Sequence, residues 1–478
     1  MSKLKPCDFV KMNTSWLDDC IMYQFYPLGL CGAPHENSWD WSNTWNAATR
    51  PIRRIDRVLL WIEQLKKLNV NAVYFSPVLQ SDTHGYNTRD FYTLDSRLGS
   101  NEDFAAVCNT LHENGIRILF DSLFNHVGRG FWAFRDIRNN MQKSRYIDWF
   151  AEIDFSRNTP CSDGFYYRSY EDNWDFPELN LENEEVVQHI FGAIRKWVDM
   201  FAIDGLRVGL ADFMSQKFLR RLREFSSNMS AGLGGNLAIL GEVYDSNSCK
   251  KIVNEKKAHA STNSELHSSI VNSVKTKNFF ELDFTLRREF GVEGIYTHTT
   301  LANFLDNHDI TRFAQVVHDK EILRLAWGLL FALPGIPCIY YGSEWGVLGS
   351  NDEVSHWGVR PSFEKPVWNE LTDFIQKVSL LRKKSPALRY GNYRYVFLSK
   401  SQYIFSRESC GQTIFIAVNA SEEDCLVEPK GGYGYAAFEG LHGIFADLIS
   451  EEQFNFNGSV FLPPKSIQYL EQLKLPTN

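Results

Sequence analysis

The sequence lacks a hydrophobic run long enough to cross a membrane. No stretch of the 478 residues reaches the roughly 18 apolar residues that a spanning helix needs. An N-terminal secretory signal is also missing, because Lys3, Lys5 and Asp8 are followed by no apolar run. There is no excess of basic residues either, since the formal net charge is −8. We therefore expect neither a membrane nor a nucleic acid as partner.

A disulfide framework is the next feature that the sequence lacks. The nine cysteines are odd in number and scattered, and no Cys-x-x-Cys pair occurs. Such a set is typical of reduced, mostly buried thiols. We expect a cytoplasmic protein, although a chain whose natural leader had been removed would have the same features.

The length predicts more than one domain, because a single hydrophobic core rarely grows beyond roughly 250–300 residues. Between residues 19 and 345 short apolar runs alternate with helical patterns, such as those at 55–68, 100–114 and 184–201. This rhythm favours a parallel sheet covered by helices, and eight strands indicate a (β/α)8 TIM barrel, an α/β fold. The predicted strands are 21–25, 72–75, 116–120, 205–208, 237–240, 279–283, 301–305 and 338–341.

Two segments depart from that rhythm. Residues 128–180 lack clean periodicity, which predicts an insertion after the third strand. From about Ala387 the pattern changes to short strands with turns at Gly431-Gly432 and Asn457-Gly458, typical of a separate β-sandwich. The predicted domains are 1–127 and 181–386 for the barrel, 128–180 for the insertion and 387–478 for the β-sandwich.

Polar side chains follow several of the predicted strands, where barrel enzymes carry their active sites. A lone polar residue at such a place is usually a helix cap or a loop carboxylate. Five strand ends in succession, each with an acid, a histidine, an arginine or a tyrosine, are not explained by caps alone. These residues are His84 and Tyr86 after the second run, Asp121, Asn125 and His126 at the third, Arg207 at the fourth, Glu242 at the fifth, and His308 and Asp309 at the seventh.

The motifs that contain these residues resemble the four ordered signature regions of the α-amylase family, glycoside hydrolase family 13. They are Asp121-x-x-x-Asn125-His126, Gly205-x-Arg207-x-Gly209, Gly241-Glu242 and Asn307-His308-Asp309. Supporting matches include Gln24-Phe25-Tyr26-Pro27, His84-Gly85-Tyr86 and Tyr340-Tyr341-Gly342-Ser343-Glu344. The resemblance covers roughly residues 19–390, and the tail resembles the family's C-terminal β-sandwich more loosely.

The resemblance implies a role for each matched residue. Glu242 matches the general acid/base, and Asp309 matches the carboxylate that stabilises the distorted transition state. His126, His308 and the His84-Gly85-Tyr86 segment match sugar-binding positions, with Tyr86 as the aromatic platform. Arg207 matches the arginine that holds the nucleophile, and Asp121 a buried carboxylate that helps to hold it. No cofactor is implied, and a structural calcium ion lacks an evident set of oxygen ligands near Asn125.

Gly209 is the main departure from the family pattern. Retaining hydrolysis needs a second carboxyl group about 5–5.5 Å from the acid, and the family has an aspartate at this position. An engineered change to glycine, for a substrate trap or a glycosynthase, is favoured because the other matched site residues are present. The alternative is a naturally non-catalytic α-glucan-binding protein. We do not expect Asp212 to replace the missing carboxylate, since strand side chains alternate faces before the next helix begins.

The predicted insertion indicates a class of substrate. Residues 163–170 resemble the cyclomaltodextrinase and neopullulanase branch, which implies an α-glucan oligosaccharide or a cyclic glucan as partner. Linkage preference, hydrolysis against transglycosylation, and the oligomeric state stay open at this point.

Overall fold

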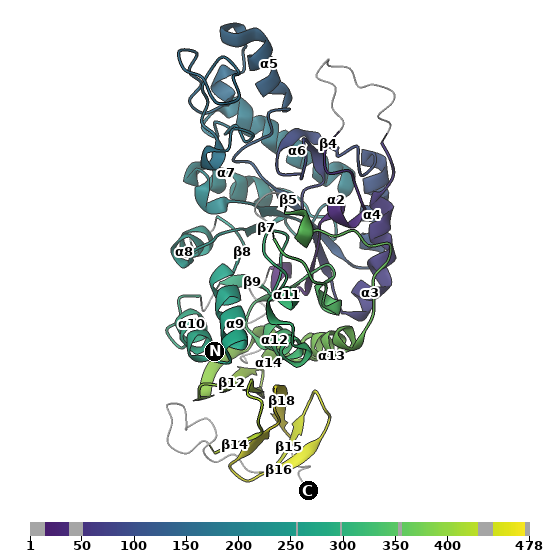
Figure 1. Ribbon diagram of the computed structural model, residues 1–478, viewed down its shortest axis with the longest axis vertical. Coiled ribbons are helices and arrows are strands. Elements are labelled where there is room, and N and C mark those ends of the chain that lie inside the picture. The colour runs from purple at the N-terminus through teal and green to yellow at the C-terminus, as the bar shows by residue number, and fades with distance from the viewer. Residues whose placement is uncertain are drawn as a thin grey trace, which may run out of the picture.

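The computed structural model describes residues 15–37, 51–254, 257–296, 299–351, 356–428 and 443–473. Three parts follow one another along the long axis (Figure 1): an insertion carrying α5 at one end, a barrel in the middle and an antiparallel sheet at the other end. In these residues we find no helix with the length and apolar character to span a membrane.

Eight strands close into a barrel in the order β1-β10-β9-β8-β7-β6-β5-β2, and all neighbouring pairs are parallel. This confirms the predicted TIM barrel. The strands are β1 (Met22–Phe25), β2 (Ala72–Phe75), β5 (Arg117–Ser122), β6 (Gly205–Val208), β7 (Ala238–Gly241), β8 (Ala260–Thr262), β9 (Thr300–Phe304) and β10 (Ile336–Tyr340). The hairpin of β3 (Leu79–Ser81) and β4 (Thr88–Leu94) follows β2.

One predicted strand is wrong. Residues 279–283 belong to the start of α10 (Phe280–Phe290), whose buried side includes Leu282, Leu286 and Phe290 at helical spacing. A short apolar run does not by itself distinguish a strand from a buried helix. The sixth strand of the barrel is instead β8, an Ala-Ser-Thr segment that is too short and too polar to stand out in the sequence.

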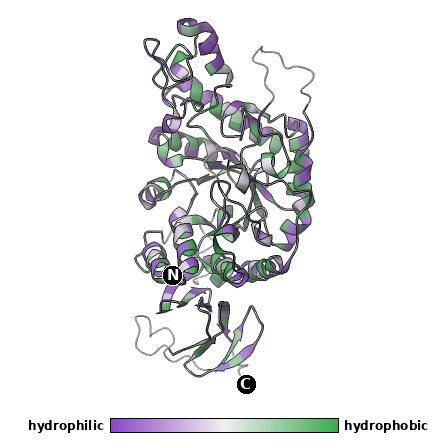
Figure 2. Cartoon of the chain, in the orientation of Figure 1, coloured by the Kyte–Doolittle hydropathy of each residue, from purple (hydrophilic) through white to green (hydrophobic). Residues whose placement is uncertain are grey.

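Helices surround the barrel, and most of them bury one face, which gives them mixed hydrophilic and hydrophobic colouring in Figure 2. Ser100 and Asp103 form the predicted capping box at the start of α4. Helices and 3-10 turns of this part are η1 (Trp16–Asp19), α2 (Pro27–Leu30), η3 (Ile55–Trp61), α3 (Ile62–Lys67), α4 (Asn101–Glu113), α6 (Glu184–Phe201), η7 (Ala211–Phe213), α7 (Gln216–Ser227), α8 (Ser246–Asn254), α9 (Ser264–Thr276), α10, α11 (Phe313–Val317), α12 (Lys320–Ala332), η8 (Ser343–Trp345), η9 (Trp357–Val359), α13 (Glu370–Lys384) and α14 (Pro386–Tyr390).

The segment between β5 and α6 forms α5 (Trp132–Asn140) and three short 3-10 turns, η4 (Met141–Lys143), η5 (Ile147–Trp149) and η6 (Tyr170–Asp172). An antiparallel bridge between His126 and Glu178 joins its far end to the mouth of the barrel. Tyr170 and Phe176 of the insertion lie near the end of β5, where their rings contact the ring of His126.

The C-terminal part is a six-stranded antiparallel sheet in the order β11-β12-β13-β18-β15-β16, with a two-stranded ribbon of β14 and β17. One face packs on the barrel, where Tyr469 donates to the carbonyl oxygen of Gly328 at 2.5 Å, and the other face packs on the ribbon. The Asn457-Gly458 turn joins β16 to β17, and Gly458 has a φ of 99°. Gly431-Gly432 lies outside the described residues. Strands are β11 (Asn392–Leu398), β12 (Gln402–Ser409), β13 (Gln412–Asn419), β14 (Cys425–Val427), β15 (Gly443–Asp447), β16 (Gln453–Phe456), β17 (Val460–Leu462) and β18 (Ser466–Gln472).

The cysteines of the described chain are mostly free thiols, as predicted: Cys20, Cys31, Cys108, Cys161, Cys249, Cys338 and Cys425. Cys410 is disulfide-bonded, so the prediction is wrong for this residue. Spacing in a sequence does not reveal which distant cysteines meet, because pairing depends on the distance between their backbones.

Candidate active site

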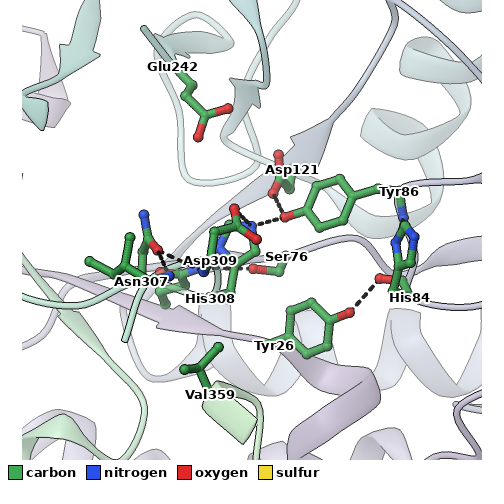
Figure 3. A network of polar contacts seen from close by, with 12 residues as sticks. Tyr26, Ser76, His84, Tyr86, Asp121, Glu242, Asn307, His308, Asp309 and Val359 are labelled. Carbon is green, nitrogen blue, oxygen red and sulfur yellow. Dashed lines mark hydrogen bonds and ion pairs between the residues drawn. The ribbon is translucent and has the colours of Figure 1, made fainter. Parts of the chain in front are cut away.

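The predicted site residues lie at the carboxyl ends of the barrel strands. Asp121 is near the end of β5 and Arg207 near the end of β6, while Glu242 directly follows β7. Asp309 lies in the loop after β9, and Tyr86 in the loop of the β3–β4 hairpin. Parallel strands of a closed barrel end at the same mouth, so side chains from distant parts of the sequence meet there (Figure 3).

A continuous chain of polar contacts links these side chains. The Arg207 guanidinium contacts Glu242 through Nη2 and donates through Nη1 to Asp121 at 2.7 Å. The Tyr86 hydroxyl donates to the other oxygen of Asp121 at 3.0 Å and also contacts Nε2 of His308. Nε2 of His308 lies 2.9 Å from Asp309. The network therefore runs from Glu242 to Asp309 across the mouth.

The tautomer of His308 follows from its neighbour Gln24. The Gln24 side-chain amide nitrogen lies 2.7 Å from Nδ1 of His308 and donates to Ser76 at 2.9 Å. An amide nitrogen can only donate, so Nδ1 of the neutral ring accepts and Nε2 carries the proton. His308 is thereby oriented to donate toward Asp309.

Each oxygen of Asp309 has a donor of its own. Oδ2 faces His308, and Oδ1 accepts from Nη2 of Arg360 at 2.8 Å. Burial by itself would raise the pKa of Asp309, but His308 and Arg360 outweigh it and hold that pKa well below its usual range. Asp309 is therefore an anion at neutral pH, and its side chain is still 42% exposed, open to a ligand.

Glu242 has the opposite electrostatic balance. Its side chain is almost buried, and Oε2 accepts from the backbone N–H of Leu210 at 3.2 Å. Burial raises the pKa of Glu242 above its usual value, although Arg207 pulls in the other direction. A carboxyl group with a raised pKa is suited to give up a proton to a leaving group and to recover it.

Gly209 lies between these groups, directly after β6. A Cβ atom at this position would lie 3.1 Å from Nη1 of Arg207, 3.2 Å from Cδ1 of Leu123 and 3.6 Å from Oε2 of Glu242. All three neighbours are side-chain atoms, and the backbone of Gly209 does not require a positive φ. A larger residue therefore fits after shifts of a few tenths of an ångström, and its side chain would point at the arginine and the acid.

Asp212 does not take the place of a side chain at position 209. It belongs to the short turn η7, and its Oδ2 accepts from the backbone N–H of Tyr244 at 3.3 Å. This contact holds the carboxylate against the loop that follows Glu242. The other carboxylate oxygen of Asp212, Oδ1, is buried and has no hydrogen-bond partner in the described residues.

His126 has a ring nitrogen at the barrel mouth, Nε2, that can accept a hydrogen bond from a ligand. Nδ1 lies 3.0 Å from the amide oxygen of Asn125, so it holds the proton, and the buried Nε2 has no partner in the described residues. Burial and the neighbouring His84 lower the pKa of His126 to about 3, and burial lowers that of His84 to about 4. Both rings are neutral at physiological pH, so Nε2 of His126 can accept a hydrogen bond from a hydroxyl group.

Reasoning from the sequence missed Arg360. Its guanidinium donates to Asp309, to the carbonyl oxygen of His308 at 2.9 Å and to the hydroxyl of Tyr26 at 3.1 Å. It follows η9 in a loop after β10 and ends no predicted strand. Gln24 and Tyr26 belonged to a supporting motif, but their contacts with the site could not be read from it.

Comparisons with known proteins extend this description. Residues 58–382 match the family described as the alpha amylase catalytic domain. This chain belongs to the alpha-amylase family. A cyclomaltodextrinase of a Bacillus species is 29% identical over 461 residues, which cover 92% of this chain and 78% of that protein. A maltogenic alpha-amylase of Bacillus acidopullulyticus is 28% identical over 432 residues, which cover 85% and 70%.

Solved structures of the family support the same assignment. A cyclomaltodextrinase superposes with a TM-score of 0.79 at 26% identity, covering 96% of this chain and 78% of that one. The ligand-free cyclic alpha-maltosyl-(1→6)-maltose hydrolase of Arthrobacter globiformis superposes with a TM-score of 0.76 at 25% identity, covering 96% and 100%. Both comparisons extend over the barrel, the insertion and the C-terminal sheet.

Proposed function

We propose that this alpha-amylase family chain binds an α-glucan oligosaccharide or a cyclic glucan at the barrel mouth, and that Gly209 occupies the position of the family's nucleophile. The relatives named for cyclic dextrins and maltose-containing sugars support this substrate class. As it stands, the chain lacks a carboxylate beside Glu242 and binds such sugars with little hydrolysis.

The observation that carries this proposal is the space beside Arg207. A side chain at position 209 would begin 3.1 Å from the guanidinium and 3.6 Å from the carboxyl group of Glu242. An aspartate there would have a cationic partner and would lie close to the acid, as retaining glycosidases require. With glycine in its place, the guanidinium contacts Glu242 instead.

The remaining side chains fit the chemistry of glycoside transfer. Glu242 would protonate the leaving oxygen while a carboxylate at position 209 attacked the anomeric carbon, and Glu242 would then deprotonate the incoming water. Asp309 would hold sugar hydroxyls and stabilise the positive charge of the transition state. Nε2 of His126 would accept from a sugar hydroxyl, and the ring of Tyr86 would support the sugar.

The test is the variant Gly209→Asp, assayed by product analysis with maltotriose, panose and a cyclic glucan. We expect the parent chain to release little product over hours and Gly209→Asp to hydrolyse at least one of these sugars faster by several powers of ten, because a covalent step is regained. The first product should have the α configuration. Glu242→Gln in the Gly209→Asp background is the matched control and should remove the gain.

A second candidate function is a non-catalytic α-glucan-binding protein. The contact between Arg207 and Glu242 favours it, because this pairing engages the acid within the chain. The activity of Gly209→Asp distinguishes the two functions, and calorimetry with maltotriose measures the sugar binding that both of them predict. Binding without activity in Gly209→Asp on any α-glucan would establish the binding protein, whereas rapid turnover by the parent chain would contradict both functions.

A further inference from the structure

A cavity lies at the end of the barrel away from the mouth, where the C-terminal sheet meets the helices. It has a volume of about 340 Å³, within the range of small-molecule sites. Its walls come from the end of α10, the segment before β10, the end of α14 and strands β11 and β12. Figure 1 shows α10, α14 and β12 at this junction. These segments precede barrel strands or follow the barrel, so the cavity is separate from the mouth that holds Glu242.

The cavity is lined by cationic side chains without acidic ones. Arg389, Arg394 and Arg407 contribute to its wall, together with Phe290 and Tyr390, and no aspartate or glutamate does so among the described residues. Arg389 contacts Asp19, which lies outside the wall. Arg394 is exposed and has no carboxylate partner in the part of the chain described here.

Arg407 is the central group, because its charge is buried without a counter-ion. It is 1% exposed, and its Nε donates to the carbonyl oxygen of Gly391 at 3.0 Å while Nη1 contacts that of Ala332. Within the described residues Nη2 has no acceptor. Burial and the nearby Arg382 lower the pKa of Arg407 well below its usual value, which shows how unfavourable an uncompensated charge is at this place.

Arg382 shows what a purely structural arginine looks like in this chain. It is equally buried, but its guanidinium donates to three backbone carbonyl oxygens, those of Phe331, Leu333 and Gly335. It does not line this cavity. Arg407 differs from it in both respects, since one nitrogen is unused and the side chain borders open space.

We propose that this cavity binds the phosphate group of a small phosphorylated molecule. A phosphate monoester carries about −1.5 to −2 charges at pH 7 and offers three acceptor oxygens, which suits two arginines that lack carboxylate partners. A carboxylate would balance only one of them. The cavity has room for an organic group beside the phosphate, and Phe290 and Tyr390 provide an apolar wall for it. This inference does not rest on the proposed function.

The experiment is titration calorimetry of the full chain with inorganic phosphate, glucose 6-phosphate and glucose at constant ionic strength. We expect binding of the two phosphates and none of glucose at this site. Equal affinities would identify free phosphate as sufficient, and tighter binding of glucose 6-phosphate would identify the phosphorylated sugar. No binding of either phosphate at roughly 10 mM, far above typical metabolite affinities, would overturn the proposal.

Two exposed arginines provide a matched pair of variants. Arg394→Glu should weaken phosphate binding at least about tenfold, because it places a negative charge on the cavity wall. Arg220→Glu changes an exposed arginine of α7, toward the other end of the molecule (Figure 1), and should leave the affinity within about twofold. Equal weakening by both would overturn the proposal. Arg407→Gln should abolish phosphate binding. If Arg407→Gln fails to fold, the result for the exposed Arg394→Glu tests the proposal by itself.

Discussion

The carboxylates on the two sides of the barrel mouth differ in their hydrogen-bond donors. On one side Asp309 has a separate donor for each oxygen, His308 and Arg360. On the other side one guanidinium, that of Arg207, is shared between Asp121 and Glu242. The first arrangement keeps a carboxylate anionic. In the second, burial raises the pKa of Glu242 more than the shared arginine lowers it.

This difference explains what a carboxylate at position 209 would change. It would compete with Glu242 for Arg207 and would add a negative charge close to Glu242. Both effects raise the pKa of Glu242 further, as in a pair of carboxyl groups whose environments drive their pKa values apart. Asp309, with donors of its own, should be affected much less. The predictions below test this contrast, beginning with the largest expected effect after the gain of hydrolysis in Gly209→Asp.

The Gly209 form should transfer sugar from β-maltosyl fluoride to a maltose acceptor. Glu242 deprotonates the acceptor hydroxyl, the new C–O bond forms as fluoride leaves into the space beside Gly209, and the α-linked product is not cleaved afterwards. Glu242→Gln should lower the transfer rate about 10²–10⁴-fold, the usual contribution of a general base. Fluoride release and product chromatography measure the rate. Equal transfer by Glu242→Gln would show that Glu242 is not the base.

Removal of the shared arginine should destabilise the fold more than removal of the dedicated one. Arg207→Met leaves two carboxylates buried without a cation, which costs about 3–5 kcal/mol of unfolding free energy. Arg360→Met leaves Asp309, which water can reach, so we expect a smaller loss of about 1–2 kcal/mol. Urea denaturation of both variants measures the difference. If Arg360→Met lost as much unfolding free energy as Arg207→Met, or more, the contrast between the two sides of the mouth would be contradicted.

His126 should make the free energy of unfolding depend on pH. Its pKa is about 3 in the folded chain and about 6.5 when unfolded, so the unfolded chain binds more protons between these values. The contribution of the neutral ring to the free energy of unfolding is complete above about pH 6.5 and is lost as the pH falls. The advantage of the parent over His126→Asn should therefore shrink by about 2 kcal/mol between pH 7 and pH 5. If the free energies of unfolding of the two proteins changed equally with pH, folding would not lower the pKa of His126, and the prediction would be wrong.

The smallest effect expected is on stability at position 209 itself. Gly209→Asp should raise the free energy of unfolding by about 1 kcal/mol, because the unfolded chain loses freedom and Arg207 gains a partner. Gly209→Asn has the same shape without the charge, so its difference from Gly209→Asp isolates the ion pair. A lower stability of the aspartate variant would mean that repulsion from Glu242 exceeds the attraction of Arg207.

The sequence predicted most of the barrel because its signals are local. Apolar runs such as residues 72–75 and 205–208 coincide with β2 and β6, and the capping box of Ser100 and Asp103 begins α4 where expected. The sixth strand was missed because β8 has only three residues of moderate polarity. Its place in the barrel is decided by pairing with β7 and β9.

The sequence by itself determined which chemical groups stand at the strand ends, from Asp121 to Asp309, because a strand and the residue that follows it are neighbours in the chain. It also showed that the residue directly after the fourth predicted strand is a glycine, Gly209. Only the tertiary structure decided how these groups pair. Gln24 meets His308 across 284 residues, and Arg360 reaches Tyr26 across 334. Such contacts depend on barrel closure and on loop paths, which leave no periodic trace in the sequence.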